Sequence, residues 1–325
     1  MVNKMGEIKL QPIIQVKNLT KRYNKAQQLA VNNISFDVQP GEFFAFLGPN
    51  GAGKTTTISI LTTTLSKTSG DITIAGYNIN NQSKDIRQNV GIVFQNPSLD
   101  LYLTAEENIR FHVSLYGDYQ YKPTYRLMPQ EYKSLVTQLA DFLDIGEDLF
   151  KPLRTFSGGM KRKLEIIRSL MHKPKILFLD EPTQGLDAVS RRDLWGYLRK
   201  VSKEQKTTIF LTTHYIEEAE FADRVCIVNH GQIAFLGTPA EMKNRLMDNY
   251  LLLDAENRSL LASELRPFKT EITPDGKFKV HFDEQTPQHI FSQIKTSLLQ
   301  LEIHTPSLEE AYMNLIDSKN LEAVQ

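Results

Sequence analysis

Residues 48–56, Gly-Pro-Asn-Gly-Ala-Gly-Lys-Thr-Thr, are the part of the sequence best suited to chemistry. Gly48, Gly53, Lys54 and Thr55 fit the pattern GxxxxGK[ST], whose glycines allow a tight loop with inward-pointing N–H groups. Such groups bind phosphate oxygens, the lysine adds a positive charge for the β- and γ-phosphates, and the hydroxyl suits Mg²⁺. The stretch therefore predicts a nucleoside-triphosphate site.

Polar residues also follow two apolar strand-like runs. Asp180 and Glu181 come directly after Lys175-Ile-Leu-Phe-Leu, and His214 follows Thr207–Thr213. Asp180 can hold the hydration shell of Mg²⁺, whereas Glu181 points the other way along an extended backbone and can polarise an attacking water. A single histidine is more often structural, but His214 can also hydrogen-bond a γ-phosphate.

For three further stretches, the sequence allows both a functional and a purely structural interpretation. Gln95 ends the run Val90–Phe94 and can contact Mg²⁺, orient a water or simply be solvated. Tyr23 is either an ordinary core or surface aromatic or a ring that stacks on adenine. Ser157-Gly158-Gly159 either only starts a helix, with Ser157 as its N-cap, or presents bare backbone N–H groups to an anion.

These residues need strands and helices to position them. The run Glu42–Leu47 predicts a strand before the glycine-rich loop, and residues 56–65 predict a helix after it. Residues 13–16 and 30–38 alternate apolar and polar residues, as half-buried strands do. Strands and helices continue to alternate to about residue 238, which indicates an α/β fold. Between them, residues 99–150 form a mainly helical insertion that opens on a capping-box pattern at Thr104.

The pattern changes after Thr238. We expect strands at 249–254, 278–282 and 301–304 and helices at 239–246, 259–265, 288–299 and 307–316. This predicts a small α+β domain over residues 239–325, in which we find no catalytic constellation.

Composition sets further bounds. The 325 residues suffice for two domains, and the 38 basic and 38 acidic residues cancel, which argues against a strongly electrostatic nucleic-acid binder. The single cysteine, Cys226, excludes an internal disulfide and sits in an apolar run that predicts burial. No apolar stretch is long enough to span a bilayer, and the N-terminus lacks a signal-peptide pattern, so we expect a cytoplasmic chain.

Six motifs, GPNGAGKTT, VFQ, FSGGM, ILFLDEP, GLD and a strand-final His, occur in the order seen in ATP-binding-cassette (ABC) ATPases. Residues 13–240 thus resemble that family, in which two cassettes face each other head to tail and share their sites. The resemblance implies a P-loop ABC ATPase core in residues 1–238, with an antiparallel β subdomain and a helical subdomain at about 97–172, followed by the appendage 239–325.

The resemblance also implies roles for individual residues, with ATP and Mg²⁺ as cofactors. Glu181 is the general base, His214 senses the γ-phosphate, and Thr55 and Gln95 serve Mg²⁺ with Asp180 behind them. The nucleotide-binding positions are Tyr23, Gly48, Asn50, Gly51, Ala52, Gly53, Lys54, Thr55, Thr56, Ser157, Gly158, Gly159 and Asp187. Among these, Ser157 to Gly159 contact the nucleotide of the partner cassette, and Asp187 lies at the seam of the pair.

The signature motif departs from the usual LSGGQ at two positions. Phe156 and Met160 replace the outer residues, while Ser157 and both glycines remain. A methionine side chain lacks the hydrogen-bonding groups of glutamine. The resemblance therefore does not imply a hydrogen bond from Met160 to the nucleotide of the partner cassette.

Residues 99–108, Leu115-Tyr-Gly and the tail Pro306–Tyr312 resemble the branch that exports drugs, polysaccharides and lipids. In that branch the cassette is a separate chain beside a polytopic membrane subunit. We therefore expect a peripheral protein on the cytoplasmic face of the cell membrane that drives export, pairs with a second cassette of the same or another chain, and binds no nucleic acid.

Two other functions are carried as alternatives. One is a soluble cassette ATPase that acts on ribosomes or DNA, although such relatives usually carry two cassettes or a long coiled coil. The other is a regulatory protein that closes on ATP without turnover, against which the presence of Glu181 argues.

Overall fold

The structure is a computed structural model that describes residues 11–24, 26–96, 98–117, 119–246, 249–282, 287–304 and 307–322. It divides into two compact units, residues 1–238 and residues 239–325, each of which is described by itself. None of the helices in the described ranges is both long and apolar enough to cross a membrane.

The first unit is built on a six-stranded sheet of order β10-β9-β3-β8-β7-β6. Its strands are β3 (Phe43–Leu47), β6 (Val90–Val93), β7 (Ile176–Asp180), β8 (Thr208–Thr213), β9 (Arg224–Asn229) and β10 (Gln232–Gly237). All neighbours pair in parallel except β9 and β10. The central strands β3, β7 and β8 are buried along their whole length. Burial on both faces explains the apolar runs of β3 and β7, whereas β8 also buries threonines.

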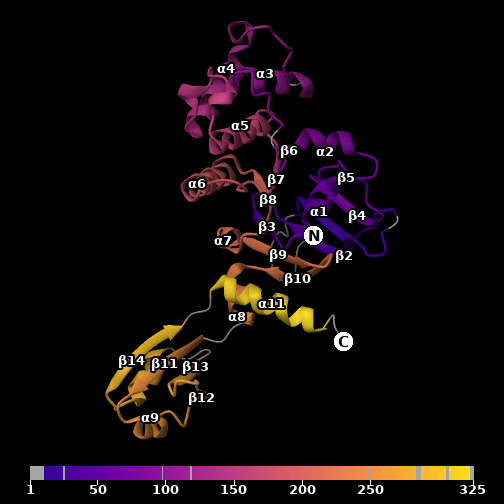
Figure 1. Ribbon diagram of the computed structural model, residues 1–325. Coiled ribbons are helices and arrows are strands. Elements are labelled where there is room, and N and C mark those ends of the chain that lie inside the picture. Colours follow the sequence, from indigo (N-terminus) through magenta and orange to yellow (C-terminus); the bar gives the residue numbers. More distant parts are fainter. Residues whose placement is uncertain are drawn as a thin grey trace, which may run out of the picture. The chain divides into compact units, whose positions relative to one another are not determined.

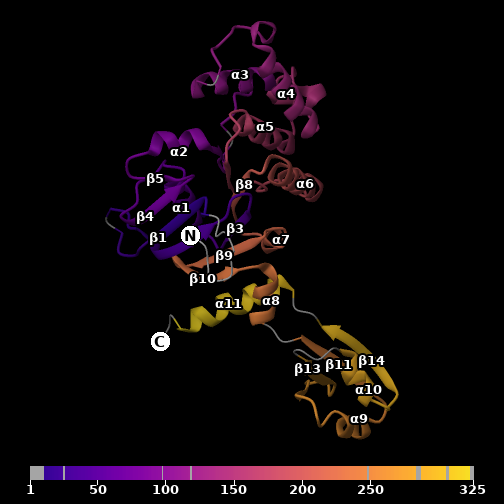
Figure 2. The ribbon, with the colours of Figure 1, turned by 180° about the vertical axis from the view of Figure 1, so that it is seen from behind.

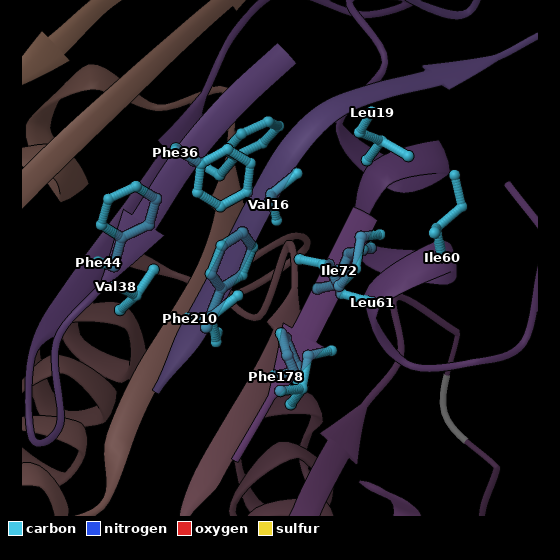
Figure 3. Packing of buried hydrophobic residues seen from close by; sticks show 14 of the residues in the cluster. Val16, Leu19, Phe36, Val38, Phe44, Ile60, Leu61, Ile72, Phe178 and Phe210 are labelled. Atoms are coloured by element: carbon cyan, nitrogen blue, oxygen red, sulfur yellow. The ribbon is translucent and has the colours of Figure 1, made fainter. Parts of the chain in front are cut away.

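A second, antiparallel sheet of order β2-β1-β4-β5 packs near the first. It comprises β1 (Ile14–Lys21), β2 (Val31–Val38), β4 (Ser69–Ile74) and β5 (Tyr77–Asn78). Phe36 of this sheet meets Phe44 and Phe210 of the central sheet at ring-centroid distances of 5.7 and 6.2 Å. Figure 3 shows these rings and Phe178 in one continuous core.

Helices flank the central sheet on both sides. The helix α1 (Lys54–Leu61) lies on the side of the antiparallel sheet, with α2 (Ser83–Asn89) nearby, and α6 (Ala188–Gln205) and α7 (Ile216–Ala219) lie on the other side (Figures 1 and 2). Asp187 caps α6 by accepting hydrogen bonds from the N–H groups of Val189 and Ser190 at 3.0 and 2.9 Å. The two sheets and their flanking helices confirm the predicted α/β architecture, including its antiparallel subdomain.

The insertion between β6 and β7 is helical, as expected. It contains α3 (Ala105–Tyr116), α4 (Gln130–Phe142), α5 (Gly158–Leu170) and short 3₁₀ turns at Tyr125–Leu127, Gly146–Asp148 and Leu153–Thr155. Thr104 and Glu107 form the predicted capping box, since each side chain bonds the backbone N–H of the other. The insertion is visible in Figure 1 as the magenta part of the ribbon.

The second unit contains a four-stranded antiparallel sheet of order β12-β13-β11-β14. Its elements are α8 (Pro239–Leu246), β11 (Asn249–Ala255), α9 (Arg258–Glu264), β12 (Thr270–Ile272), β13 (Phe278–Phe282), α10 (Pro287–Gln293), β14 (Leu298–His304) and α11 (Leu308–Glu322). Leu251, Leu253 and Val280 of the sheet pack with Leu261 of α9 and Ile290 of α10 in a core of their own.

Some predicted elements were wrong in extent. The helix expected at 288–299 ends at Gln293, because Leu298 and the following residues pair with β11 as a strand. The helix after the phosphate loop starts at Lys54 rather than 56 and ends at Leu61 rather than 65. Apolar spacing alone did not reveal these boundaries, since tertiary pairing decides where each element ends.

Candidate active site at the edge of the central sheet

The phosphate loop and the predicted residues Gln95, Glu181 and His214 lie at the carboxyl ends of four adjacent parallel strands. Strand register aligns Leu47 with Thr213, Thr212 with Asp180, and Leu179 with Val93. The phosphate loop, His214, Glu181 and Gln95 follow these strand ends and so come to one edge of the sheet. Carboxyl edges of parallel sheets are where nucleotide ligands usually bind.

Two glycines of the phosphate loop are required by close backbone approaches. A Cβ atom on Gly48 would lie 2.3 Å from the carbonyl oxygen of Val228, and one on Gly53 would lie 2.5 Å from that of Ala30. Gly53 also has a φ of +103°, a conformation that favours glycine. The loop can therefore close onto β9 and the start of β2 only with glycine at both positions.

Lys54 is buried at the base of the loop. Its Nζ donates to the carbonyl oxygens of Gly48 and Pro49 at 2.8 and 3.2 Å and lies 3.6 Å from Glu181 Oε1. Burial lowers the pKa of Lys54, and the Glu181 carboxylate opposes that shift. The Lys54 ammonium group therefore lies at the base of a loop whose N–H groups can bind phosphate oxygens, where it can pair with the phosphate chain of a nucleotide.

Glu181 is the centre of the polar cluster. Besides Lys54, the Nε2 of Gln95 lies 3.4 Å from Glu181 Oε2, and the Nδ1 of His214 lies 3.3 Å from Oε1. Glu181 is only 7% exposed and has a φ of 46°, so its turn is held in a strained conformation of the kind found at functional sites. Among the described residues, that Nδ1 of His214 is a buried atom without a well-aligned hydrogen bond.

Asp180 lies behind this cluster. It accepts a hydrogen bond from the Thr212 hydroxyl at 2.5 Å, and the same hydroxyl accepts from the N–H of Glu181 at 3.1 Å. Burial raises the pKa of Asp180, although the Thr212 bond acts in the opposite direction. Thr212 therefore fixes both acids, a role that sequence reasoning missed; a polar residue inside a buried strand was the available signal.

A cavity of about 360 Å³ opens over these groups. Its lining consists of Ala30, Asn50, Gly51, Gly53, Lys54, Thr55, Thr56, Gln95, Glu181 and Gln184. Gln184, which the sequence did not single out, accepts from Gln95 Nε2 at 2.7 Å. The OH of Tyr23 lies 3.2 Å from the Thr56 hydroxyl, so the half-exposed ring borders the loop helix, whereas Gly48, Ala52, Asp180 and His214 lie outside the cavity lining.

The signature residues line a different cavity, of about 80 Å³. Ser157, Gly159 and Met160 contribute to it, together with residues of α6 such as Ser190. Ser157 caps α5 by accepting from the N–H of Met160 at 3.2 Å. Within the described chain the two cavities share no lining residue, so Ser157 and Gly159 and the phosphate loop line different cavities.

Three charged residues of α5 connect that helix to the Gln95 loop. Arg162 donates to the carbonyl oxygens of Phe94 and Gln95 at 2.8 and 3.2 Å and pairs with Glu165 at 2.9 Å. Glu165 accepts from the N–H of Ser98 at 3.2 Å, and Arg168 donates to the carbonyl of Ser98 at 2.7 Å. Sequence reasoning missed this connection, although the i, i+3, i+6 spacing places all three on one face of the helix.

Comparisons with known proteins identify the family of the chain. Residues 31–184 match the family model described as ABC transporter. The chain is 33% identical to the linearmycin resistance ATP-binding protein LnrL of Bacillus subtilis, over 93% of this chain and 98% of the relative. It is 34% identical to the Nod factor export ATP-binding protein I of Burkholderia pseudomallei, over 95% of this chain and 98% of that protein.

The fold is also similar to solved cassettes. One is the dimeric post-hydrolysis state of the ATP-binding cassette MJ0796 bound to ADP and Pi, which has a TM-score of 0.60 and 26% identity, with 69% of this chain and 98% of that chain covered. The relatives named here give no support to a ribosome- or DNA-acting ATPase. The chain belongs to the ABC transporter family, as an ATP-binding and ATP-hydrolysing subunit of a membrane transporter.

Proposed function

We propose that the chain powers export by pairing head to tail with a second cassette around two ATP molecules. The convergence of Lys54, Gln95, Glu181 and His214 at one sheet edge carries this proposal. The separate Ser157 cavity supports a partner that completes the site, since the two cavities have no lining residue in common. The names of the relatives, which refer to resistance and export, support the direction of transport.

In this proposal each residue at the sheet edge has a distinct task. Lys54 leaves Glu181 for the phosphates, and Glu181 then orients and deprotonates the attacking water. His214 donates to the γ-phosphate through a ring nitrogen, in keeping with its buried Nδ1, which lacks a well-aligned partner in the described structure. Tyr23 stacks on the adenine, and Asn50 to Thr56 surround the phosphates.

The residues present fit a Mg²⁺ ion that arrives with ATP. In the described part of the chain, no group of three or more His, Cys, Asp or Glu side chains could hold a metal by itself. Thr55 and Gln95 line the cavity, and their hydroxyl and amide oxygens are hard donors, with Asp180 behind them. Mg²⁺ would therefore be held partly by these side chains and partly by phosphate oxygens. When bound, it would neutralise charge on the β- and γ-phosphates.

Switching the cassettes from mostly open to mostly closed requires about 5.5 kcal/mol of differential binding. Two triphosphates, each contacted by the loop of one protomer and the Ser157 helix of the other, can supply it. The Arg162 connection between α5 and Gln95 would make the helical insertion respond to the nucleotide.

We further propose that the insertion contacts a separate polytopic membrane subunit at the cytoplasmic face of the membrane. Phe111 and Leu115 lie one turn apart on one face of α3 and are 54% and 70% exposed, and Tyr102, shortly before the helix, is 87% exposed. Exposed apolar residues that lie together in this way often mark interaction sites. Leu115→Glu should abolish co-purification with the membrane subunit but leave ATP binding intact. Retained co-purification would contradict this docking surface.

The decisive experiment on the site is Glu181→Gln in the full chain. We expect ATP binding and an ATP-dependent dimer to persist while phosphate release falls by at least about a hundredfold, the contribution of a general base. Glu217→Gln, an exposed acid on α7, is the matched control and should behave as wild type. Equal phosphate release from the Glu181 variant would refute the assigned role, and an absence of release from the wild type with its partners would favour the regulatory alternative.

A further inference from the structure

Glu218 on α7 is a buried acid to which the proposed mechanism gives no task. It is 1% exposed, and a carboxylate in such a position costs free energy unless hydrogen bonds replace those to water. Threonine hydroxyls supply them, since Thr183 donates to Oε1 and Thr213 donates to Oε2, the latter at 2.5 Å. Burial raises the pKa of Glu218, whereas these two bonds lower it, so the hydroxyls stabilise the ionised carboxylate.

The two threonines lie in the loops that carry the proposed catalytic groups. Thr183 lies two residues after Glu181, in the turn that follows β7. Thr213 directly precedes His214, and its hydroxyl accepts from the N–H of Tyr215 at 3.0 Å, so this bond spans the histidine. One carboxylate therefore joins the loop of Glu181 to the loop of His214. The two hydrogen bonds from the threonines are called the Glu218 bridge below.

The Glu218 bridge lies outside the nucleotide cavity. Thr183, Thr213 and Glu218 are each 1% exposed and are not part of the lining of the cavity of about 360 Å³. The direct contact between the two loops, from His214 Nδ1 to Glu181 Oε1 at 3.3 Å, is lost if the histidine turns to a γ-phosphate. An incoming nucleotide does not displace the Glu218 bridge, so the bridge can hold the two loops together at that step.

We propose that Glu218 is a positioning residue for ATP hydrolysis, which keeps His214 at a fixed place relative to Glu181. It acts through the two loops, because it lies outside the cavity. The inference rests on the proposed roles of Glu181 and His214 and adds the group that sets their spacing. A misplacement of about 1 Å can cost about a hundredfold in rate, so loss of the bridge should reduce turnover more than nucleotide binding.

Two substitutions of Glu218 in the full chain separate the bridge from the charge. Glu218→Met removes both hydrogen bonds, and we expect kcat for phosphate release to fall by at least about tenfold while the Kd for ATP changes by less than about threefold. Glu218→Gln should keep at least about a third of the wild-type kcat, because its amide oxygen can accept from one hydroxyl while its NH₂ group donates to the other. Glu217→Met, the same change at the exposed neighbouring acid, is the matched control and should behave as wild type.

Two further measurements separate positioning from a loss of folding. Thr183→Val keeps the shape of the side chain and breaks the bridge at its other end, so it should reproduce the fall in kcat even if Glu218→Met folds poorly. A double-mutant cycle, read by single-turnover phosphate release, tests whether the effect passes through the histidine. On a His214→Ala background, Glu218→Met should cost less than about threefold.

Wild-type turnover by Glu218→Met or by Thr183→Val would overturn the proposal. An equal loss in Glu218→Gln and Glu218→Met would do so as well, because the charge and not the bridge would then matter. The same loss on the His214→Ala background as in the wild type would show that Glu218 acts independently of the histidine. A failure of the proposed function looks different, since Glu181→Gln itself would then release phosphate as the wild type does.

Discussion

Arg162→Met tests whether α5 positions the Gln95 loop. The substitution removes two hydrogen bonds to backbone carbonyls and leaves the carboxylate of Glu165, which is 2% exposed, without its ion-pair partner. Breaking a buried pair in this way costs about 3–5 kcal/mol. For a unit of this size, that loss should lower the melting temperature by roughly 6–20 °C.

The double variant Arg162→Met/Glu165→Leu separates stability from positioning. Because both charges are removed together, we expect stability to return to within about 2 kcal/mol of wild type. Gln95 nevertheless lacks its backbone anchor, and a displacement of about 1 Å can cost a hundredfold in rate. Phosphate release should thus stay depressed by about ten- to a hundredfold while ATP binding is retained.

Urea denaturation and steady-state phosphate release are the two assays for these variants. If the double variant regained both stability and wild-type turnover, Arg162 would be only a structural residue and the reasoning about Gln95 would be refuted.

Three further outcomes are expected. Gly48→Ala should weaken ATP binding by more than about tenfold and destabilise the unit by about 1–3 kcal/mol, because the added Cβ would lie 2.3 Å from the carbonyl oxygen of Val228. The control Gly196→Ala has open space around the added Cβ and should be neutral or stabilising. Tyr23→Ala should weaken ATP binding by about 1–3 kcal/mol in calorimetry but leave inorganic triphosphate binding unchanged, and equal losses for both ligands would argue against stacking. Burial is the main cause that lowers the pKa of His112 on α3 from 6.5 to about 3. Between pH 6.5 and 3 the unfolded chain therefore binds a proton on His112 that the folded chain does not. The free energy of unfolding should thus fall as the pH drops from 6.5 towards 3, by about 1.4 kcal/mol per pH unit at most. His112→Gln should remove that slope in urea titrations at pH 7 and pH 5, and an unchanged slope would show that other groups cause it.

Much of the site was predictable from the sequence because its residues follow strand ends. Gln95, Glu181 and His214 each follow a strand that the sequence predicts, and parallel strands bring their carboxyl ends to one edge. The glycines at 48 and 53 likewise fit a known loop pattern.

The connections between distant segments were not predictable in this way. Arg162 bonds the carbonyl of Phe94 across 68 positions of sequence, and helical spacing alone does not identify what a charged face contacts. Gln184 and Thr212 are ordinary polar residues until the fold places them beside Gln95 and Asp180. The start of β14 was predicted to be helical, because Ile290, Ile294 and Leu298 repeat at intervals of four, as on a helix face. Leu298 instead belongs to a strand because it pairs with β11.

The helix α5 belongs to two sites at once. Ser157 caps its N-terminus at one cavity, and Arg162, little more than one turn further on, holds the loop of the other. If an occupant of the Ser157 cavity changes nucleotide affinity at the Gln95 side, thermodynamic linkage requires the reverse effect to have the same size. In a head-to-tail pair, this reciprocity would extend to both nucleotides, so a protomer with an inactive site could still tune the affinity of its active partner.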